Sequence, residues 1–182
     1  PPAVPAFTAE TETRTGTFLL QNVYESWPRL PREEPIRQLR ILQVLPKTTP
    51  NANSPRVGLA NASPGKQVLG TVPVEPDGSA LFRIPANTPI SIQPLDGRGR
   101  AMQIMRSWFT AMPGEVVSCV GCHEPRHGTP TSTAKLPPVH FRRLDRPAGP
   151  RYEGGLSFGR TVQPVLDRYC IACHGLAETA GG

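Results

Sequence analysis

Two cysteine motifs, each followed at once by a histidine, are the residues of this chain best suited to chemistry. The first is Cys119-Val-Gly-Cys122-His123 and the second is Cys170-Ile-Ala-Cys173-His174. Two thiols separated by two residues can form thioether bonds with the two vinyl groups of one haem, and the following imidazole then ligates the iron. The sequence therefore predicts two covalently bound c-type haems, with His123 and His174 as iron ligands.

Zinc and disulfides are the rival interpretations of these four cysteines. Tandem CxxC pairs also build zinc sites with four thiolate ligands. Here 47 residues, 123 to 169, lie between the two pairs, which is longer than the usual spacing of a zinc ribbon. Zinc also gives no reason for a histidine after both pairs. We therefore favour haem and keep zinc and disulfides as alternatives.

The second axial ligands of the two irons have several candidates. Besides the motif histidines the chain has only His127 and His140, which together would complete two bis-histidine irons. Each of them could instead be an ordinary surface histidine. Methionine sulfur is an alternative iron ligand, and the chain offers Met102, Met105 and Met112. Met102 and Met105 fall in a predicted strand, where core burial is the usual role.

Composition and charge exclude several functional classes. The chain has 182 residues, of which 37% are hydrophobic, so it can bury a core. Its formal charge is +6 and its pI is near 9.6. No nucleic-acid module accompanies this charge, and haem propionates would offset much of it, so we expect no nucleic-acid partner. No apolar run is long enough to span a membrane. Neither a Ser-His-Asp arrangement nor a phosphate loop is present, so any chemistry must come from the haems.

The elements that must position the first motif are predicted to be strands. Apolar or β-branched runs are separated by turn residues about every ten positions, which is typical of a mainly β, antiparallel β-sandwich-like domain. Ala80, Phe82 and Ile84 are predicted to share one face of a strand, and the turn residues at 75–78 and 96–99 to join neighbouring runs. The predicted strands are 17–24, 38–45, 70–74, 79–84, 89–95 and 101–109.

The second motif is predicted to follow the one convincing helix, over residues 161–171. That helix would deliver Cys170 directly into the motif, and Pro164 is tolerable in its first turn. Its apolar residues recur at helical spacing: Val162, Val165, Leu166 and Tyr169.

Three regions follow from these patterns: an extended linker over 1–16, the β-sandwich-like domain over 17–112, and a loop-rich dihaem region over 113–182. Haem is attached to CxxCH motifs outside the cytoplasm, so we expect an extracytoplasmic protein whose leader has been removed, or an internal piece of a longer protein. The linker-like start, and an end only eight residues after His174, favour the second expectation.

The stretch from Val72 to Arg126, which includes VPVEPDGSALFRIP and CVGCHEPR, resembles the middle domain of the hydrazine synthase alpha subunit and related planctomycete multihaem cytochromes. The resemblance extends over most of residues 17–127, and FGRTVQPVLDRYCIACHG looks like the haem helix of planctomycete cytochrome c domains. It implies a periplasmic redox protein within a longer chain or oligomer, whose partners are other haem-bearing domains or subunits and redox proteins.

The same resemblance bears on the ligands of the first haem. In hydrazine synthase a tyrosine four residues after the motif histidine ligates the catalytic iron, and that histidine binds zinc. This chain has His127 at the tyrosine position, so either His123 or His127 could be the proximal ligand. A neutral imidazole favours a closed, low-spin iron, so we expect electron transfer. The alternative is a catalytic haem of a hydrazine-synthase-like oxidoreductase that acts on small nitrogen compounds.

Overall fold

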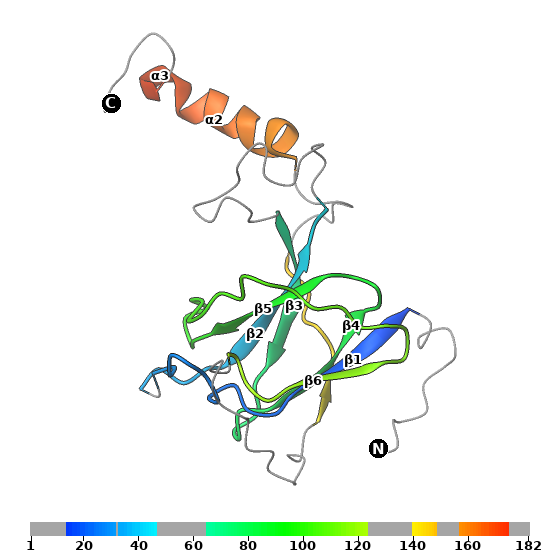
Figure 1. Ribbon diagram of the computed structural model, residues 1–182. Coiled ribbons are helices and arrows are strands. Elements are labelled where there is room, and N and C mark those ends of the chain that lie inside the picture. Colours follow the sequence, from blue (N-terminus) through cyan, green and yellow to red (C-terminus); the bar gives the residue numbers. More distant parts are fainter. Residues whose placement is uncertain (1–13, 32, 47–64, 124–139, 149–156, 175–182) are drawn as a thin grey trace. The chain divides into compact units, whose positions relative to one another are not determined.

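The computed structural model of this chain describes residues 14–31, 33–46, 65–123, 140–148 and 157–174. It divides into two compact units, Pro1–Ala148 and Gly149–Gly182. The described strands all belong to unit 1 and the described helices to unit 2 (Figure 1). The predicted mainly β fold is confirmed. Among the described residues, no helix is long and apolar enough to cross a lipid bilayer.

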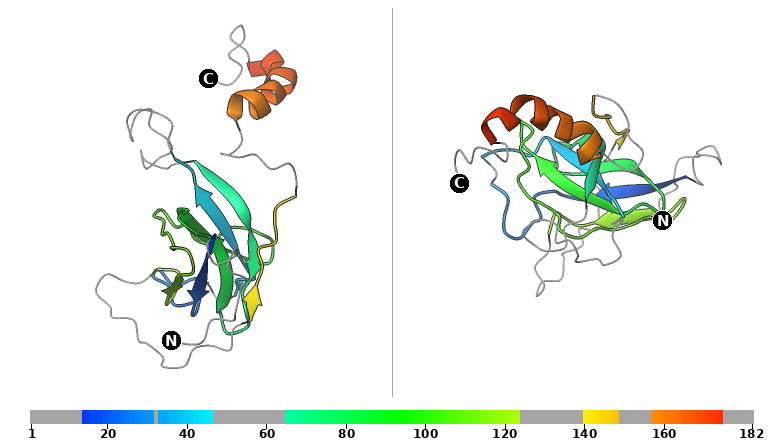
Figure 2. Two further views of the ribbon diagram at one scale, coloured as in Figure 1. Left: turned by 90° about the vertical axis from the view of Figure 1, so that its right-hand side faces the viewer. Right: turned by 90° about the horizontal axis from the view of Figure 1, so that it is seen from above.

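Two sheets form unit 1, as Figure 1 and the further views of Figure 2 show. The strand order of the larger sheet is β6-β1-β4-β7 and that of the smaller sheet is β3-β2-β5. The edge strands β6 and β7 run parallel to β1 and β4, whereas all other neighbours are antiparallel. The strand bounds are β1 Thr15–Leu20, β2 Gln38–Val44, β3 Lys66–Pro73, β4 Ala80–Pro85, β5 Ile90–Leu95, β6 Val116–Cys119 and β7 Phe141–Arg142.

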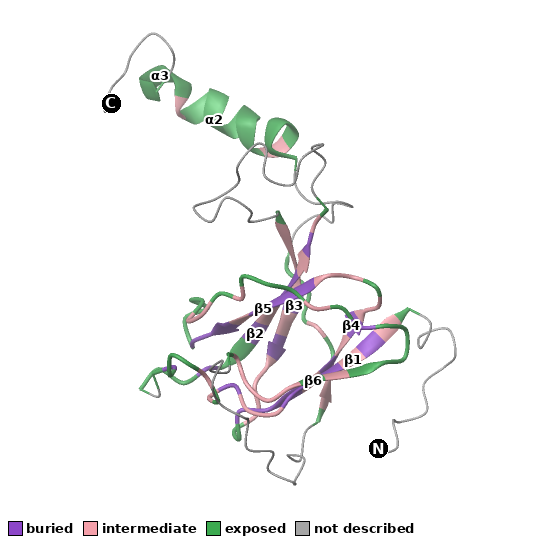
Figure 3. Ribbon diagram, in the orientation of Figure 1, coloured by how far each residue is buried: buried purple, intermediate pink, exposed green. Residues whose placement is uncertain are grey.

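Side chains from both sheets form one hydrophobic core. Phe18 and Phe82 come from the larger sheet and Ile41 and Ile90 from the smaller one, and each is at most 1% exposed. The rings of Phe18 and Phe82 lie 5.3 Å apart in a tilted arrangement that favours aromatic contact. Buried and half-buried residues alternate along β4 (Figure 3), which confirms the predicted inward face of this strand.

The predicted turn between β3 and β4 is present. The Gly78 N–H donates to the Glu75 carbonyl at 2.8 Å, and the Ser79 N–H donates to Asp77 Oδ1 at 2.9 Å. Gly78 has φ +88°, a conformation that favours glycine because no Cβ is present to clash. The local sequence therefore accounts for the hydrogen bonds within this turn.

The segment 101–109, which we call the strap, departs from its predicted strand. Its backbone pairs with β5 at isolated bridges near its two ends, where Ala101 pairs with Leu95 and Phe109 with Ile90. Pro94 of β5 has no N–H to give to a neighbouring strand and offers only its carbonyl. A regular ladder along this edge of β5 is therefore interrupted, and the strap leaves the sheet between its two ends.

The bounds of the sandwich also differ from the predicted ones. β1 begins at Thr15, inside the predicted linker, whose residues 1–13 lie outside the described ranges. β6 and β7 extend the larger sheet past residue 112, and the compact unit ends at Ala148. Both strands are short and pair with distant partners, so neither gives a clear alternating pattern in the sequence.

Unit 2 confirms the predicted helix and lengthens it at both ends. A π-helical turn η1 (Phe158–Val162) leads into α2 (Gln163–Tyr169) and α3 (Ile171–His174). Pro164 has no N–H and its ring crowds the carbonyl four residues earlier, which accounts for the widened first turn. No residue within these three elements is buried.

The packing of the core predicts how shortening a buried side chain changes the stability of unit 1. Phe82→Ala should lower the free energy of unfolding by about 3–5 kcal/mol, because it leaves a cavity between the two sheets. Urea denaturation of the whole chain measures this value. Met112→Ala is the control, since Met112 is 68% exposed and its loss should cost less than about 0.5 kcal/mol. Equal effects of the two substitutions would show that the core is misplaced.

Candidate functional site

The first CxxCH motif begins at the end of β6, beside the end of β1. β6 pairs in parallel with β1, so that Cys119 is the register partner of Leu20. The two segments stay together beyond their strands. The N–H groups of Gln21 and Asn22 donate to the carbonyls of Cys119 and Val120, both at 3.0 Å. The motif therefore enters its loop with a backbone position that β1 sets.

The rest of the motif is held by the same neighbouring loop. The Cys122 N–H donates to the Glu25 carbonyl at 3.1 Å, and the Trp27 N–H donates to the His123 carbonyl at 2.8 Å. Together with the two preceding bonds, these contacts between residues 21–27 and 119–123 form what we call the motif clamp. It pairs backbone N–H and carbonyl groups of the two loops, and it fixes the backbone positions from which the two thiols and the imidazole extend.

Gly121 allows the close approach within the motif clamp. A Cβ at this position would overlap the carbonyl oxygen and carbon of Glu25. Any other residue would push the motif away from the loop that holds it. The glycine between the two cysteines is thus a packing requirement of this unit.

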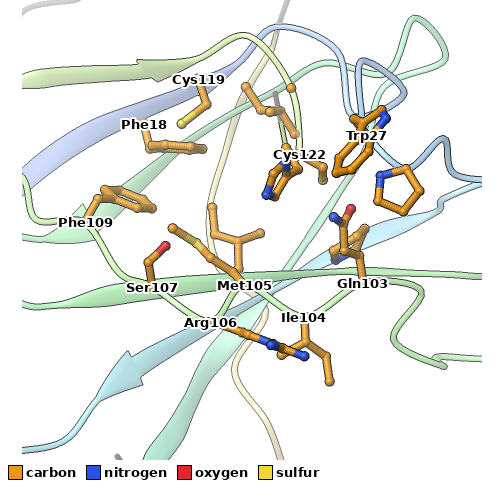
Figure 4. A pocket seen from close by; sticks show the side chains of 16 residues that line it. Phe18, Trp27, Gln103, Ile104, Met105, Arg106, Ser107, Phe109, Cys119 and Cys122 are labelled. Carbon is orange, nitrogen blue, oxygen red and sulfur yellow. The ribbon is translucent and has the colours of Figure 1, made fainter. Parts of the chain in front are cut away.

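A pocket of about 740 Å³ opens beside the motif (Figure 4). Cys119, Cys122 and His123 line one part of it, and residues 103–107 of the strap line another. This volume lies within the range of cofactor and ligand sites. The remaining lining is mainly apolar and includes Phe18, Leu20, Trp27, Ile92, Pro94 and Phe109.

The two thiols differ from ordinary exposed cysteines. Cys119 and Cys122 are partly buried and pack against the hydrophobic core. Burial raises the pKa of Cys122 to about 12, and the neighbouring Cys119 adds to the shift. The Cys122 thiol is therefore protonated at neutral pH, and a buried, protonated thiol is a weak nucleophile towards small reagents.

The donor set of this pocket fits a c-type haem. Two thiols in an apolar pocket match the requirement for two thioether bonds, and the adjoining imidazole of His123 would be available to ligate the iron. The ring centroid of Trp27 lies 6.3 Å from that of His123, at 44° between the planes. Within the described ranges, no three His, Cys, Asp or Glu side chains gather closely enough to hold a metal ion by themselves.

The second motif is built on a helix end in unit 2. The Cys170 N–H donates to the Leu166 carbonyl and the His174 N–H to the Cys170 carbonyl, both at 2.8 Å. Residues three and four positions apart share a helix face, so Cys170, Cys173 and His174 lie on one side. The predicted apolar stripe is exposed, including Leu166 at 38% and Tyr169 at 68%.

The other predicted ligands lie in different places. His127 is outside the described residues. His140 is exposed, directly before β7, and does not line the pocket, so its role as a ligand stays a prediction. Met102 packs against the core, Met105 lines the pocket, and Met112 is exposed.

Sequence reasoning missed two parts of the pocket. Trp27 was not among the predicted site residues, and the strap was predicted to be a strand. Neither has a local signal that points to the motif, because both reach it through contacts between residues far apart in the chain. The stacking of Phe109 on Phe18, with centroids 4.7 Å apart, joins the strap to the core.

Comparison with known proteins identifies the relatives of unit 1. Residues 35–124 match the family model of the hydrazine synthase alpha subunit middle domain. Among solved structures, the Kuenenia stuttgartiensis hydrazine synthase matches with a TM-score of 0.59 and 18% identity. This match covers 96% of the present chain and 32% of that chain. The comparison with curated proteins found no match.

The two matches agree on the part of the chain that carries the sandwich and the first motif. At 18% identity the structural match shows a common fold, and the chain spans about a third of the length of that relative. The family match ends at residue 124, directly after the first motif. Residues 35–124 of this chain are therefore similar to the hydrazine synthase alpha subunit middle-domain family.

Proposed function

We propose that this chain is a dihaem c-type cytochrome that transfers electrons outside the cytoplasm. The observation that carries the proposal is the pocket at the first motif. It brings two thiols and one imidazole to an apolar space of about 740 Å³, and the motif clamp holds their backbone. The haems would supply one-electron chemistry, and extracytoplasmic location follows because haem is attached to CxxCH motifs there.

The side chains of each motif have distinct roles in this proposal. Cys119 and Cys122 bond the first haem, and Cys170 and Cys173 bond the second. His123 and His174 ligate the two irons. Apolar residues such as Phe18 exclude water from the first pocket, which sets the local dielectric and with it the reduction potential.

Electron transfer also fits the second motif. The helix of unit 2 exposes its apolar stripe beside the thiols, and a haem attached there would cover part of it. A haem near the surface can exchange electrons with other haem-bearing domains, subunits or redox proteins. We propose that such partners adjoin unit 2 and that the protein works in an oligomer or a longer multihaem chain.

The second candidate function is a catalytic haem at the first motif, acting on small nitrogen compounds. The family of residues 35–124 favours it, since the matched relative is a hydrazine synthase. The two functions differ in the sixth coordination position of the first iron. Catalysis needs this position open to a substrate, whereas an electron-transfer haem keeps it filled.

Carbon monoxide separates the two functions. The purified, reduced chain should bind no carbon monoxide at neutral pH, because both irons carry two protein ligands. An optical titration of the reduced protein measures this, with a guanidinium-unfolded sample as the positive control. Binding at one haem per chain in the folded protein would favour the catalytic function instead.

The number of attached haems tests the cofactor itself. Chain produced with haem-attachment machinery should show by intact mass two haems per chain. The double variant Cys119→Ser/Cys122→Ser should retain only the second haem, and Cys170→Ser/Cys173→Ser only the first, so each serves as the control for the other. A chain with stoichiometric zinc and no haem would refute the proposal.

The motif clamp predicts the effect of a substitution at Gly121. Gly121→Ala should lower the free energy of unfolding by about 1–3 kcal/mol, because the methyl group overlaps the Glu25 carbonyl and displaces the motif. Intact mass should then show incomplete attachment of the first haem. Gly97→Ala is the matched control, since its nearest neighbour would be Arg37 Cγ at 3.9 Å. Full attachment in both variants would show that the clamp does not position the thiols.

A further inference from the structure

The strap is fixed along the pocket at three places. Near its start the Met102 N–H donates to the Pro94 carbonyl at 2.9 Å, and near its end Phe109 exchanges two backbone bonds with Ile90. Between them the Met105 carbonyl accepts hydrogen bonds from the side chains of Lys66 and Ser91. The irregular backbone of residues 103–107 is thus tied to β5 on both sides.

Two side chains hold the middle of the strap. Lys66 Nζ donates to the Met105 carbonyl at 2.9 Å, and Ser91 Oγ donates to the same oxygen at 3.1 Å. Lys66 Nζ also contacts Ser91 Oγ at 2.9 Å, and Ser91 is fully buried. Two hydrogen bonds therefore end on the Met105 carbonyl and a third joins their donors, so the backbone position of Met105 is closely defined.

The side chain of Met105 extends into the pocket. Figure 4 shows its thioether on the strap side, across the pocket from Cys119 and Cys122. The other polar side chains of the strap that line the pocket are Gln103, Arg106 and Ser107. A guanidinium has no lone pair to donate, and amide or hydroxyl oxygens are hard ligands, whereas thioether sulfur is a soft, neutral one.

We propose that Met105 Sδ is the second axial ligand of the first haem iron, opposite His123. This inference rests on the proposed function, because it requires a haem on Cys119 and Cys122. Lys66 and Ser91 are then positioning residues, which act on the iron only through the Met105 backbone. Histidine–methionine ligation raises the reduction potential of a haem above that of a bis-histidine haem.

The test uses Met105→Leu in the haem-loaded chain, with Met102→Leu as the matched control. Both exchanges nearly conserve volume and are well tolerated in packed sites. In Met105→Leu one of the two haems should become high-spin, lose the long-wavelength band of methionine-ligated ferric haem and bind carbon monoxide when reduced. Met102→Leu should change none of these spectra. Met105→His should remain low-spin with a lower reduction potential.

A measurement on the unsubstituted protein tests the assignment independently of whether the variants fold. The reduced chain should give a methionine methyl proton resonance shifted far upfield by the porphyrin ring current. Its absence, or an unchanged spectrum in folded Met105→Leu, would overturn the assignment while two attached haems still support the proposed function. A chain whose intact mass shows no haem at the first motif would overturn both.

Discussion

The parallel pairing of β6 with β1 is the contact on which the first site depends. Its register places Cys119 beside Leu20, and from there both chains leave the sheet together and form the motif clamp. β1 also pairs with β4 and contributes Phe18 to the core. The position of the motif is therefore coupled to the packing between the sheets, in contrast to a motif carried on an independent loop.

Local patterns were sufficient to predict most of the fold. β2, β4, β5 and the helix before Cys170 agree with the sequence because alternation, turn residues and helical spacing are properties of neighbouring residues. β6, β7 and the strap were not predicted. Their conformations depend on partners remote in the chain, such as β1 for β6 and the Lys66 side chain for the strap.

The same distinction applies to the site. Cys119, Cys122 and His123 belong to one short motif, so their residue types and spacing directly suggest a haem. The side of the pocket that the strap lines has no such motif. Met105 falls in a predicted strand with core burial as its usual role, but it lines the pocket because the strap leaves the regular ladder of β5 and its Met105 carbonyl is held by the Ser91 hydroxyl. Sequence therefore identifies the residues of the motif far better than the pocket residues that face them.

The two motifs also differ in the stage of folding at which their geometry can form. The motif clamp joins residues 21 and 119, which lie 98 positions apart (119 minus 21), and contacts at such separation require most of unit 1 to have closed on itself. The second motif needs only the hydrogen bonds of its own helix, which form on a much faster timescale. In a chain emerging from a membrane channel, the second pair of thiols would therefore need no contact with distant residues to reach its helical geometry. The first pair would reach its clamped geometry only together with the sandwich, so under the proposed function the two haem attachments would act on substrates in different states of folding.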